Sequence, residues 1–414
     1  MTPLRERRVI RMQKTEKINI IVTLITCLLC VGLFSFLHEY AQSKAKYIGV
    51  TKVGFILTGD ESTPYSENFI RAIEGLEREF GTDVSVYTMY NVPFEDADEM
   101  IEELAASDVK IIFADSEGYA EAMKEGASKH PGIQFCQATA DNANSSPSYE
   151  NYHTFMGWIY QGRYVAGKMA GLKMQELIDN GVIGENDAKI GYVGAFSCPE
   201  VVSGYTAFFL GARSVCPTAH MVVGYTETWT SYVAEKEMAE QFINEGCVII
   251  AQHSDTIGPA IACEEAAVYK PVYHVGYNQD MVSIAPTTSI IGTKIDWTNY
   301  IVGAVDAIRK EKRIEDVVDA ETNGNDAGAG FERGWVAMFE LNMAVAAPGS
   351  EEVLEDTIED FRKERCHVFY GDFTGVNPEN PDDTVNLNNE FYENNKTSYP
   401  TFYYILDDVI EVRN

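Results

Sequence analysis

Short runs of β-branched and aromatic residues alternate with stretches of helical apolar spacing over most of the chain after residue 50. This alternation predicts parallel sheets with helices packed on both faces, an α/β fold. The predicted strands cover residues 53–57, 84–90, 109–114, 133–137, 189–193, 221–226, 247–252, 272–277 and 290–296. The predicted helices include residues 96–105, 119–129, 161–179, 199–212, 233–245, 256–269 and 297–310.

The alternation pauses at residues 138–151, which are rich in Asn and Ser and have the composition of a loop. It then resumes with a second series of strands and helices. This interruption favours two α/β lobes over one large sheet. Beyond Glu311 the pattern changes, with an acidic amphipathic helix predicted over 351–365 and an acidic C-terminal extension over 376–414.

The N-terminal part combines a basic stretch with a long apolar run. Residues 1–46 hold eight basic and three acidic side chains, and residues 18–37 form a run of 20 residues without charge. As a helix this run is about 30 Å long, which matches one bilayer core. The basic flank then predicts a cytoplasmic N-terminus and an extracytoplasmic remainder.

Three kinds of N-terminal segment are compatible with this run. A cleaved signal peptide normally has a shorter apolar run and a better cleavage site than the one at 41–43. A lipoprotein signal would end at a Cys, but the sequence before Cys27 is a poor lipobox and apolar residues continue beyond it. We therefore favour an uncleaved signal anchor, with residues 1–46 as cytoplasmic stub and membrane helix.

The charge balance excludes one class of partner. The chain has 414 residues with 32 Lys+Arg against 63 Asp+Glu, a formal net charge of −31. Such an acidic surface repels phosphate backbones, so nucleic-acid binding is not expected.

The sequence gives little support for enzyme chemistry. Residues 162–168 have the spacing of a phosphate-binding P-loop, but Met169 stands where Ser or Thr would hold magnesium, and the spacing of 164, 165 and 169 fits a helix. The sequence has no GxGxxG, GxSxG or HExxH motif. We expect no enzyme activity, no cofactor and no metal.

A ligand site is expected beyond the carboxyl ends of the strands, where open parallel sheets bind ligands. Aromatic and acidic side chains follow the predicted strands there. The candidates are Tyr65, Ser116, Tyr119, Phe196, Glu200, Trp229, Asp255 and Asp280. Aromatic side chains stack on flat rings, and carboxylates accept from ring N–H or ribose hydroxyl groups. The combination indicates a nitrogen-rich ring as ligand, although Asp255, Asp280 and Glu200 also fit positions that favour helix starts.

Five segments of the sequence stand out together, and they are residues 155–171, 189–217, 226–256, 275–281 and 360–375. In this order they resemble the basic membrane protein (BMP) family of solute-binding proteins for ABC transporters. The resemblance implies a type I periplasmic-binding-protein fold with two doubly wound parallel-sheet lobes and a three-segment hinge. It implies lobe 1 over 47–157 with 285–322, and lobe 2 over 158–284 with 323–375.

The resemblance also carries family positions onto this chain. It supports the candidates above and adds Glu117, Trp158 and Tyr160 near the cleft. Nucleoside-binding members usually place Asn after the first-loop aromatic, whereas Ser66 follows Tyr65 here. Both a purine nucleoside and a free base such as adenine therefore stand as expected ligands.

The leading hypothesis is a membrane-anchored, extracytoplasmic solute-binding protein that delivers purine nucleosides or bases to an ABC permease. One alternative is a ligand sensor with the same fold, and another is a binder of a different aromatic solute such as a flavin. A surface enzyme acting on nucleosides would have to use Asp255 with His253. Trp229→Ala and Asp280→Ala are each expected to weaken binding at least tenfold, about 1.4 kcal/mol.

Overall fold

The computed structural model describes residues 49–394, 396–407 and 409–413, together with Val22, residues 25–26 and residues 32–33. The chain divides into two compact units, Met1–Val50 and Thr51–Asn414. The predicted cytoplasmic stub and membrane anchor lie almost entirely outside the described residues. Among the residues that are described, none of the helices has the length and apolar character needed to cross a bilayer.

The first sheet of the Thr51–Asn414 unit has seven strands in the order β11-β12-β5-β4-β3-β1-β2, and β11 alone runs antiparallel to its neighbour. The strands are β1 (Thr51–Ile56), β2 (Val84–Met89), β3 (Ile111–Ala114), β4 (Gln134–Ala138), β5 (Tyr152–Gly157), β11 (Glu321–Asn323) and β12 (Asp326–Ala329). Alternate side chains of β1 face opposite ways. Phe55 packs with α2 (Pro64–Phe80) and α9 (Thr298–Arg309), and Ile56 packs with α3 (Ala97–Ala106) and α4 (Ala120–Lys129). This sheet and its four helices are lobe 1.

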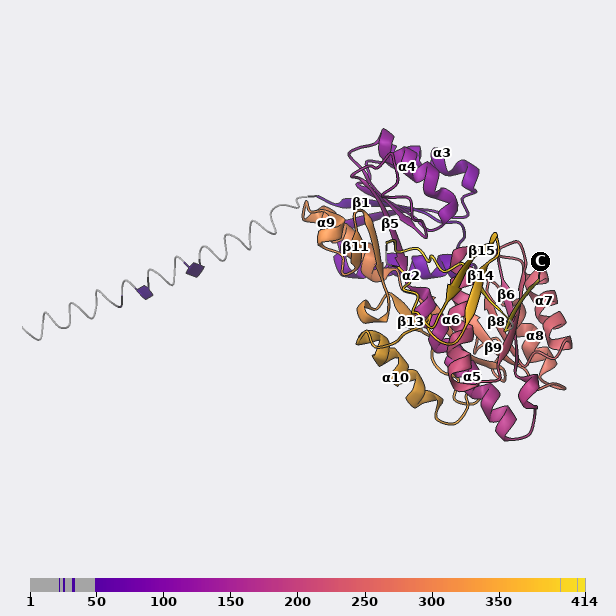
Figure 1. Ribbon diagram of the computed structural model, residues 1–414. Coiled ribbons are helices and arrows are strands. Elements are labelled where there is room, and N and C mark those ends of the chain that lie inside the picture. Colours follow the sequence, from indigo (N-terminus) through magenta and orange to yellow (C-terminus); the bar gives the residue numbers. More distant parts are fainter. Residues whose placement is uncertain are drawn as a thin grey trace, which may run out of the picture. The chain divides into compact units, whose positions relative to one another are not determined.

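The second sheet also has seven strands, in the order β13-β10-β9-β8-β6-β7-β17, with β13 antiparallel. The strands are β6 (Lys189–Gly194), β7 (His220–Tyr225), β8 (Ile249–His253), β9 (Tyr273–Tyr277), β10 (Ser289–Ile295), β13 (Val336–Met338) and β17 (Ile410–Arg413). Its faces are covered by α5 (Ile159–Asp179) and α6 (Pro199–Val215) on one side and by α7 (Tyr232–Asn244) and α8 (Gly258–Ala266) on the other (Figure 1). This sheet and these helices are lobe 2.

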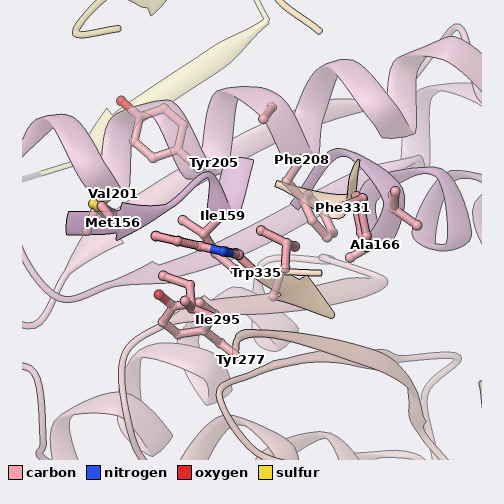
Figure 2. Close-up of a cluster of buried hydrophobic side chains, with 14 of the residues drawn as sticks. Met156, Ile159, Ala166, Val201, Tyr205, Phe208, Tyr277, Ile295, Phe331 and Trp335 are labelled. Carbon is pink, nitrogen blue, oxygen red and sulfur yellow. The ribbon is translucent and has the colours of Figure 1, made fainter. Parts of the chain in front are cut away.

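The chain crosses between the lobes three times. It passes from β5 to α5 at residues 157–159, from β10 to α9 at residues 295–298, and from β12 to β13 at residues 329–336. Apolar side chains from the crossings share one buried cluster, part of which Figure 2 shows with Met156, Ile295 and Trp335 labelled. The doubly wound two-lobe fold expected from the sequence is therefore confirmed.

Two segments belong to the lobe opposite to the one the sequence indicated. Strand β10 lies within the predicted lobe 1 segment 285–322, but it pairs with β9 in lobe 2. Strand β12 lies within the predicted lobe 2 segment 323–375, but it pairs with β5 in lobe 1. Both β10 and β12 are buried on both faces, so the composition of a strand does not reveal which strand it pairs with.

The C-terminal residues are not a separate acidic extension. They form a small antiparallel sheet of β14 (Thr374–Asn377), β15 (Asn380–Asn386) and β16 (Ile405–Leu406), and β17 then joins lobe 2 beside β7. The predicted acidic helix is present as α10 (Ser350–Arg362). Stacking of Phe402 on Phe369, with ring centroids 4.6 Å apart, gives this region its own apolar contacts.

The P-loop-like residues 162–168 lie inside helix α5, as the sequence predicted. Helices α5 and α6 approach closely because glycines face each other across the contact. A Cβ atom at Gly167 would lie 1.9 Å from the carbonyl oxygen of Phe208, and one at Gly211 would lie 2.1 Å from that of Tyr164.

We expect Gly167→Ala to lower the free energy of unfolding by about 2 kcal/mol, because the new methyl group forces the two backbones apart. Urea unfolding followed by circular dichroism measures the change. Gly132→Ala is the control, since no described atom lies within 4 Å of a Cβ built there. Equal midpoints for the two variants would contradict the close helix contact.

Candidate ligand site between the lobes

The carboxyl ends of the two sheets face each other within the Thr51–Asn414 unit, and polar groups join them. The Asn68 side-chain amide of lobe 1 donates to the backbone oxygen of Asn278 in lobe 2 at 3.0 Å. Both residues are almost fully buried. The lobes are therefore in contact across the cleft.

The lobe 1 side of the cleft is built around Asp115, which follows β3 directly. Its carboxylate is fully buried and accepts from the backbone N–H and hydroxyl of Thr58 and from the hydroxyl of Ser66, at 3.0–3.2 Å. The hydroxyl of Tyr65 donates to the backbone oxygen of Asp115. Burial raises the pKa of the Asp115 carboxyl to about 7, although these hydrogen bonds oppose the shift.

The lobe 2 side is built around Asp255, which follows β8 at the same edge of its sheet. Its carboxylate accepts from the Asn278 side-chain amide at 2.9 Å, and its backbone N–H donates to Trp229 O at 2.8 Å. Burial is the main cause that raises the pKa of Asp255 to about 7. Two carboxyl groups that can each carry a proton near neutral pH therefore approach the cleft from opposite lobes.

A layer of aromatic and charged groups lies behind Asp255. The Tyr277 hydroxyl donates to Glu200 at 3.3 Å, and His253 lies 3.5 Å from the same carboxylate. The buried guanidinium of Arg163 donates to the Tyr192 hydroxyl at 2.7 Å. Burial lowers the pKa of His253, which favours the neutral imidazole.

An aromatic pair stands beside these groups at the ends of β6 and β7. The rings of Phe196 and Trp229 meet edge to face with centroids 5.8 Å apart, and Trp229 lies 6.4 Å from the His253 ring. Both aromatic residues are half-buried. Their ring faces remain partly available to a planar ligand.

The structure brings most predicted site residues to this region. Residues that lie at or near the buried Asp115 and Asp255 are Tyr65, Ser116, Phe196, Glu200, Trp229 and Asp255 itself. Trp158 lies at the first hinge crossing, and its indole N–H finds no hydrogen-bond partner among the described residues. Tyr160 packs on Phe369 of the C-terminal region, with centroids 5.5 Å apart.

Two predicted residues lie elsewhere. Tyr119 is fully buried in the lobe 1 core, where its hydroxyl donates to Val92 O and its ring packs on Phe94. Asp280 is exposed and accepts from Val282 N at 3.0 Å within a turn. The chain turns away after β9 because Asn278 adopts a left-handed conformation with φ of 60°, so Asp280 faces solvent while Asn278 faces the cleft.

Several polar groups of the site were not selected from the sequence. Asp115 directly follows a predicted strand, next to the candidate Ser116, and the sequence places it at the expected edge of the sheet, but it was not chosen as a ligand contact. The sequence indicated the carboxylate of Asp280 at this point of the site. The side chain that contacts Asp255 is instead that of Asn278, two residues earlier. The buried Arg163 lies inside a predicted helix, where a charged residue usually faces solvent.

A hollow of about 860 Å³ lies on lobe 1 but at the opposite edge of its sheet, around the starts of β4 and β5. Polar side chains in its wall already have partners. His153 pairs with Glu315 and Gln134 at 2.5 and 2.9 Å, and the Asn151 amide donates to three backbone carbonyls. These wall groups are therefore already used in contacts within the protein.

Comparison with curated proteins found two relatives of particular interest. The chain is 32% identical over 266 residues to a putative ABC transporter glucose-binding protein of Haloferax volcanii, a match that covers 64% of this chain and 62% of that protein. It is 30% identical over 261 residues to a purine-binding protein of Brucella abortus, which covers 62% of this chain and 68% of that protein. The chain thus spans less than two thirds of the length of the first relative.

Solved structures of solute-binding proteins share the fold. One from an ABC transporter system of Conexibacter woesei has a TM-score of 0.60 at 16% identity and covers 77% of this chain and 98% of its own. A second structure, from Aeropyrum pernix, has a TM-score of 0.60 at 14% identity, and the match covers 80% of this chain and 95% of the other chain. At these identities the likeness concerns the fold alone.

A family profile described as ABC transporter substrate-binding protein, PnrA-like, matches residues 47–352. That match spans both lobes and all three crossings. The family and its fold are those of substrate-binding proteins and not of enzymes. The family resemblance inferred from the sequence is confirmed by a match that includes four of the five segments, and the chain belongs to the Bmp family of ABC transporter substrate-binding proteins.

Proposed function

We propose that this protein captures a purine base or nucleoside between its lobes and presents the closed form to an ABC permease. The observation that carries the proposal is the pair of buried carboxyls, Asp115 and Asp255, facing one cleft beside the aromatic pair of Phe196 and Trp229. A carboxyl with a pKa of about 7 either donates or accepts a hydrogen bond near neutral pH. A purine ring offers both donors and acceptors along its edge.

The geometry also explains how ligand binding would be signalled. A ligand that contacts both lobes favours the closed arrangement by its difference in affinity for the closed and open states. The three crossings form a hinge of short segments on which the lobes can rotate. The permease then distinguishes loaded from empty protein by this arrangement.

We propose an extracytoplasmic location for the two lobes. The apolar run at 18–37, preceded by basic residues, would tether the binding domain to the membrane near its permease. This proposal rests on the sequence.

A thermal-shift screen of the purified chain tests the ligand. A ligand that binds only the folded state raises the melting temperature once its concentration far exceeds Kd. We expect a shift with adenine or a purine nucleoside and none with glucose. The opposite result would favour a sugar, the ligand in the name of the Haloferax volcanii relative, and would overturn the purine proposal.

Trp229→Ala is expected to weaken purine binding at least tenfold. Stacking on an aromatic side chain contributes about 1–3 kcal/mol per base, and the alanine variant loses that contact. Isothermal titration calorimetry measures Kd for both proteins. Binding equal to that of the parent would remove Trp229 from the site.

A further inference from the structure

One segment near the C-terminus is hydrogen-bonded to both lobes, and we call its described residues, 393–394 and 396–402, the C-terminal strap. It lies beyond residue 352, where the family match ends. In Figure 1 the yellow C-terminal chain runs beside both lobes before β17 joins the second sheet. The strap therefore ties the lobes together in addition to the three hinge crossings.

The strap is attached to lobe 1 through Asp326 on β12. The Asp326 carboxylate accepts from Ser398 N at 2.5 Å and from the Ser398 hydroxyl at 2.7 Å. Thr154 of β5 donates to the same carboxylate at 2.7 Å. All three residues are buried, so this attachment is a shielded hydrogen-bonded contact and not a surface ion pair.

The strap is attached to lobe 2 through Glu393. Its carboxylate accepts from the hydroxyl of Ser203 on α6 at 2.7 Å. The same carboxylate accepts from the backbone N–H groups of Thr401 and Phe402, which close the strap into a loop. Tyr403, just after the strap, lies within hydrogen-bond distance of the Ser197 hydroxyl at 3.2 Å.

Tyr399 directly follows Ser398 in the strap. It is 8% exposed, and its hydroxyl lies beside the Cys198 thiol and near Glu117 of lobe 1 and Glu200 of lobe 2. Burial raises the pKa of the Tyr399 hydroxyl well above its ordinary value, so the group stays a neutral donor. It therefore faces acidic groups from both lobes without adding to their charge.

The strap also adjoins the hinge tryptophan. A Cβ atom at Gly328 would lie 2.6 Å from Trp158 Nε1 and 2.8 Å from the Cβ atom of Ser398. Trp158, whose indole N–H has no hydrogen-bond partner among the described residues, therefore lies against the strap at the first hinge crossing.

We propose that the C-terminal strap is a third wall of the ligand site and that Tyr399 is a ligand-contacting residue that selects for a hydrogen-bond acceptor on the purine. The attachment of Ser398 to Asp326 holds this wall in place. The ligand class rests on the function proposed above, whereas the attachment of the strap to both lobes does not.

Titration calorimetry on the full chain in detergent tests Tyr399, with adenine and adenosine as probes. We expect Tyr399→Ala to weaken binding at least tenfold and Tyr399→Phe about fivefold, because the second change removes only the hydroxyl. Tyr370→Ala is the matched control, since that side chain lies in the same region but is 57% exposed, and we expect its Kd within twofold of the parent. If both Tyr399 variants bind like the parent, the strap is not a wall of the site.

Hydrogen exchange of the ligand-free protein tests the attachment without any ligand. We expect Ser398→Ala to speed exchange of the strap amides at least fivefold, because one of its two bonds to Asp326 is lost. Thr154→Val is the control, because it removes a bond to the same carboxylate from within lobe 1. Unchanged exchange in Ser398→Ala would overturn the attachment, and failure of the parent to bind any purine would overturn only the ligand class.

Discussion

Asp255→Ala is expected to weaken purine binding about a hundredfold, close to 2.7 kcal/mol. The ligand loses a hydrogen bond to a buried carboxyl, which contributes about 1.5–3 kcal/mol when the carboxyl is ionised. The Asn278 side-chain amide, which donates to Asp255 at 2.9 Å, also loses the acceptor that holds it in position for the ligand. The measurement is Kd by titration calorimetry at pH 7.

The matched control is Asp280→Ala, the same change in the same lobe. The sequence alone placed both carboxylates in the site, but Asp280 is exposed and bonded within its own turn. We now expect the control to bind within twofold of the parent. A tenfold loss in Asp280→Ala with no loss in Asp255→Ala would reverse the assignment drawn from the structure.

The alternation of strands and helices was sufficient to predict most of the fold. Each predicted strand overlaps a strand of the structure, because buried parallel strands are continuous apolar runs of characteristic length. Strand β5 was not predicted, since its sequence mixes polar and apolar residues at both faces. Strand β17 was hidden in a segment whose acidic composition resembles a solvated tail.

The assignment of strands to lobes required pairing information that one sequence does not contain. β10 and β12 exchange lobes relative to the predicted boundaries because each lies next to a hinge crossing. If the chain crossed between the lobes one strand earlier or later, the local pattern of apolar and polar residues would be the same. Only the pairing of β10 with β9 and of β12 with β5 shows to which lobe each strand belongs.

The site residues were predictable where they directly follow a strand. Topology alone brings Asp255 and Phe196 to the cleft, because the carboxyl ends of parallel strands meet at one edge. Side chains that depend on local backbone geometry were not predictable, and the left-handed turn at Asn278 is the example. The contribution of Tyr399 depends on a tertiary contact between the C-terminus and the cleft, which no local pattern indicates.

Asp115→Asn is expected to stabilise the ligand-free protein increasingly as pH rises from 4 to 7. The pKa of Asp115 is about 7 in the folded protein, against 3.8 for an unperturbed carboxyl. Between these values the folded state holds a proton that the unfolded state has released. Rising pH therefore lowers the free energy of unfolding of the parent, by about 4 kcal/mol at most for this difference in pKa.

Asparagine does not titrate, so the difference in unfolding free energy between Asp115→Asn and the parent should grow through this window and level off above pH 7. Changes in the hydrogen bonds to Thr58 and Ser66 add a constant offset, and the slope with pH is therefore the informative quantity. Urea unfolding at pH 4, 5, 6, 7 and 8 measures it. Asp60→Asn is the control, because hydrogen bonds from Asn91 and Ser62 lower the pKa of Asp60 to about 2, which places its titration below the window. Parallel curves for Asp115→Asn and the parent would show that the carboxyl is ionised at neutral pH in the folded protein, and the cleft would then offer the ligand a fixed negative charge instead of an exchangeable proton.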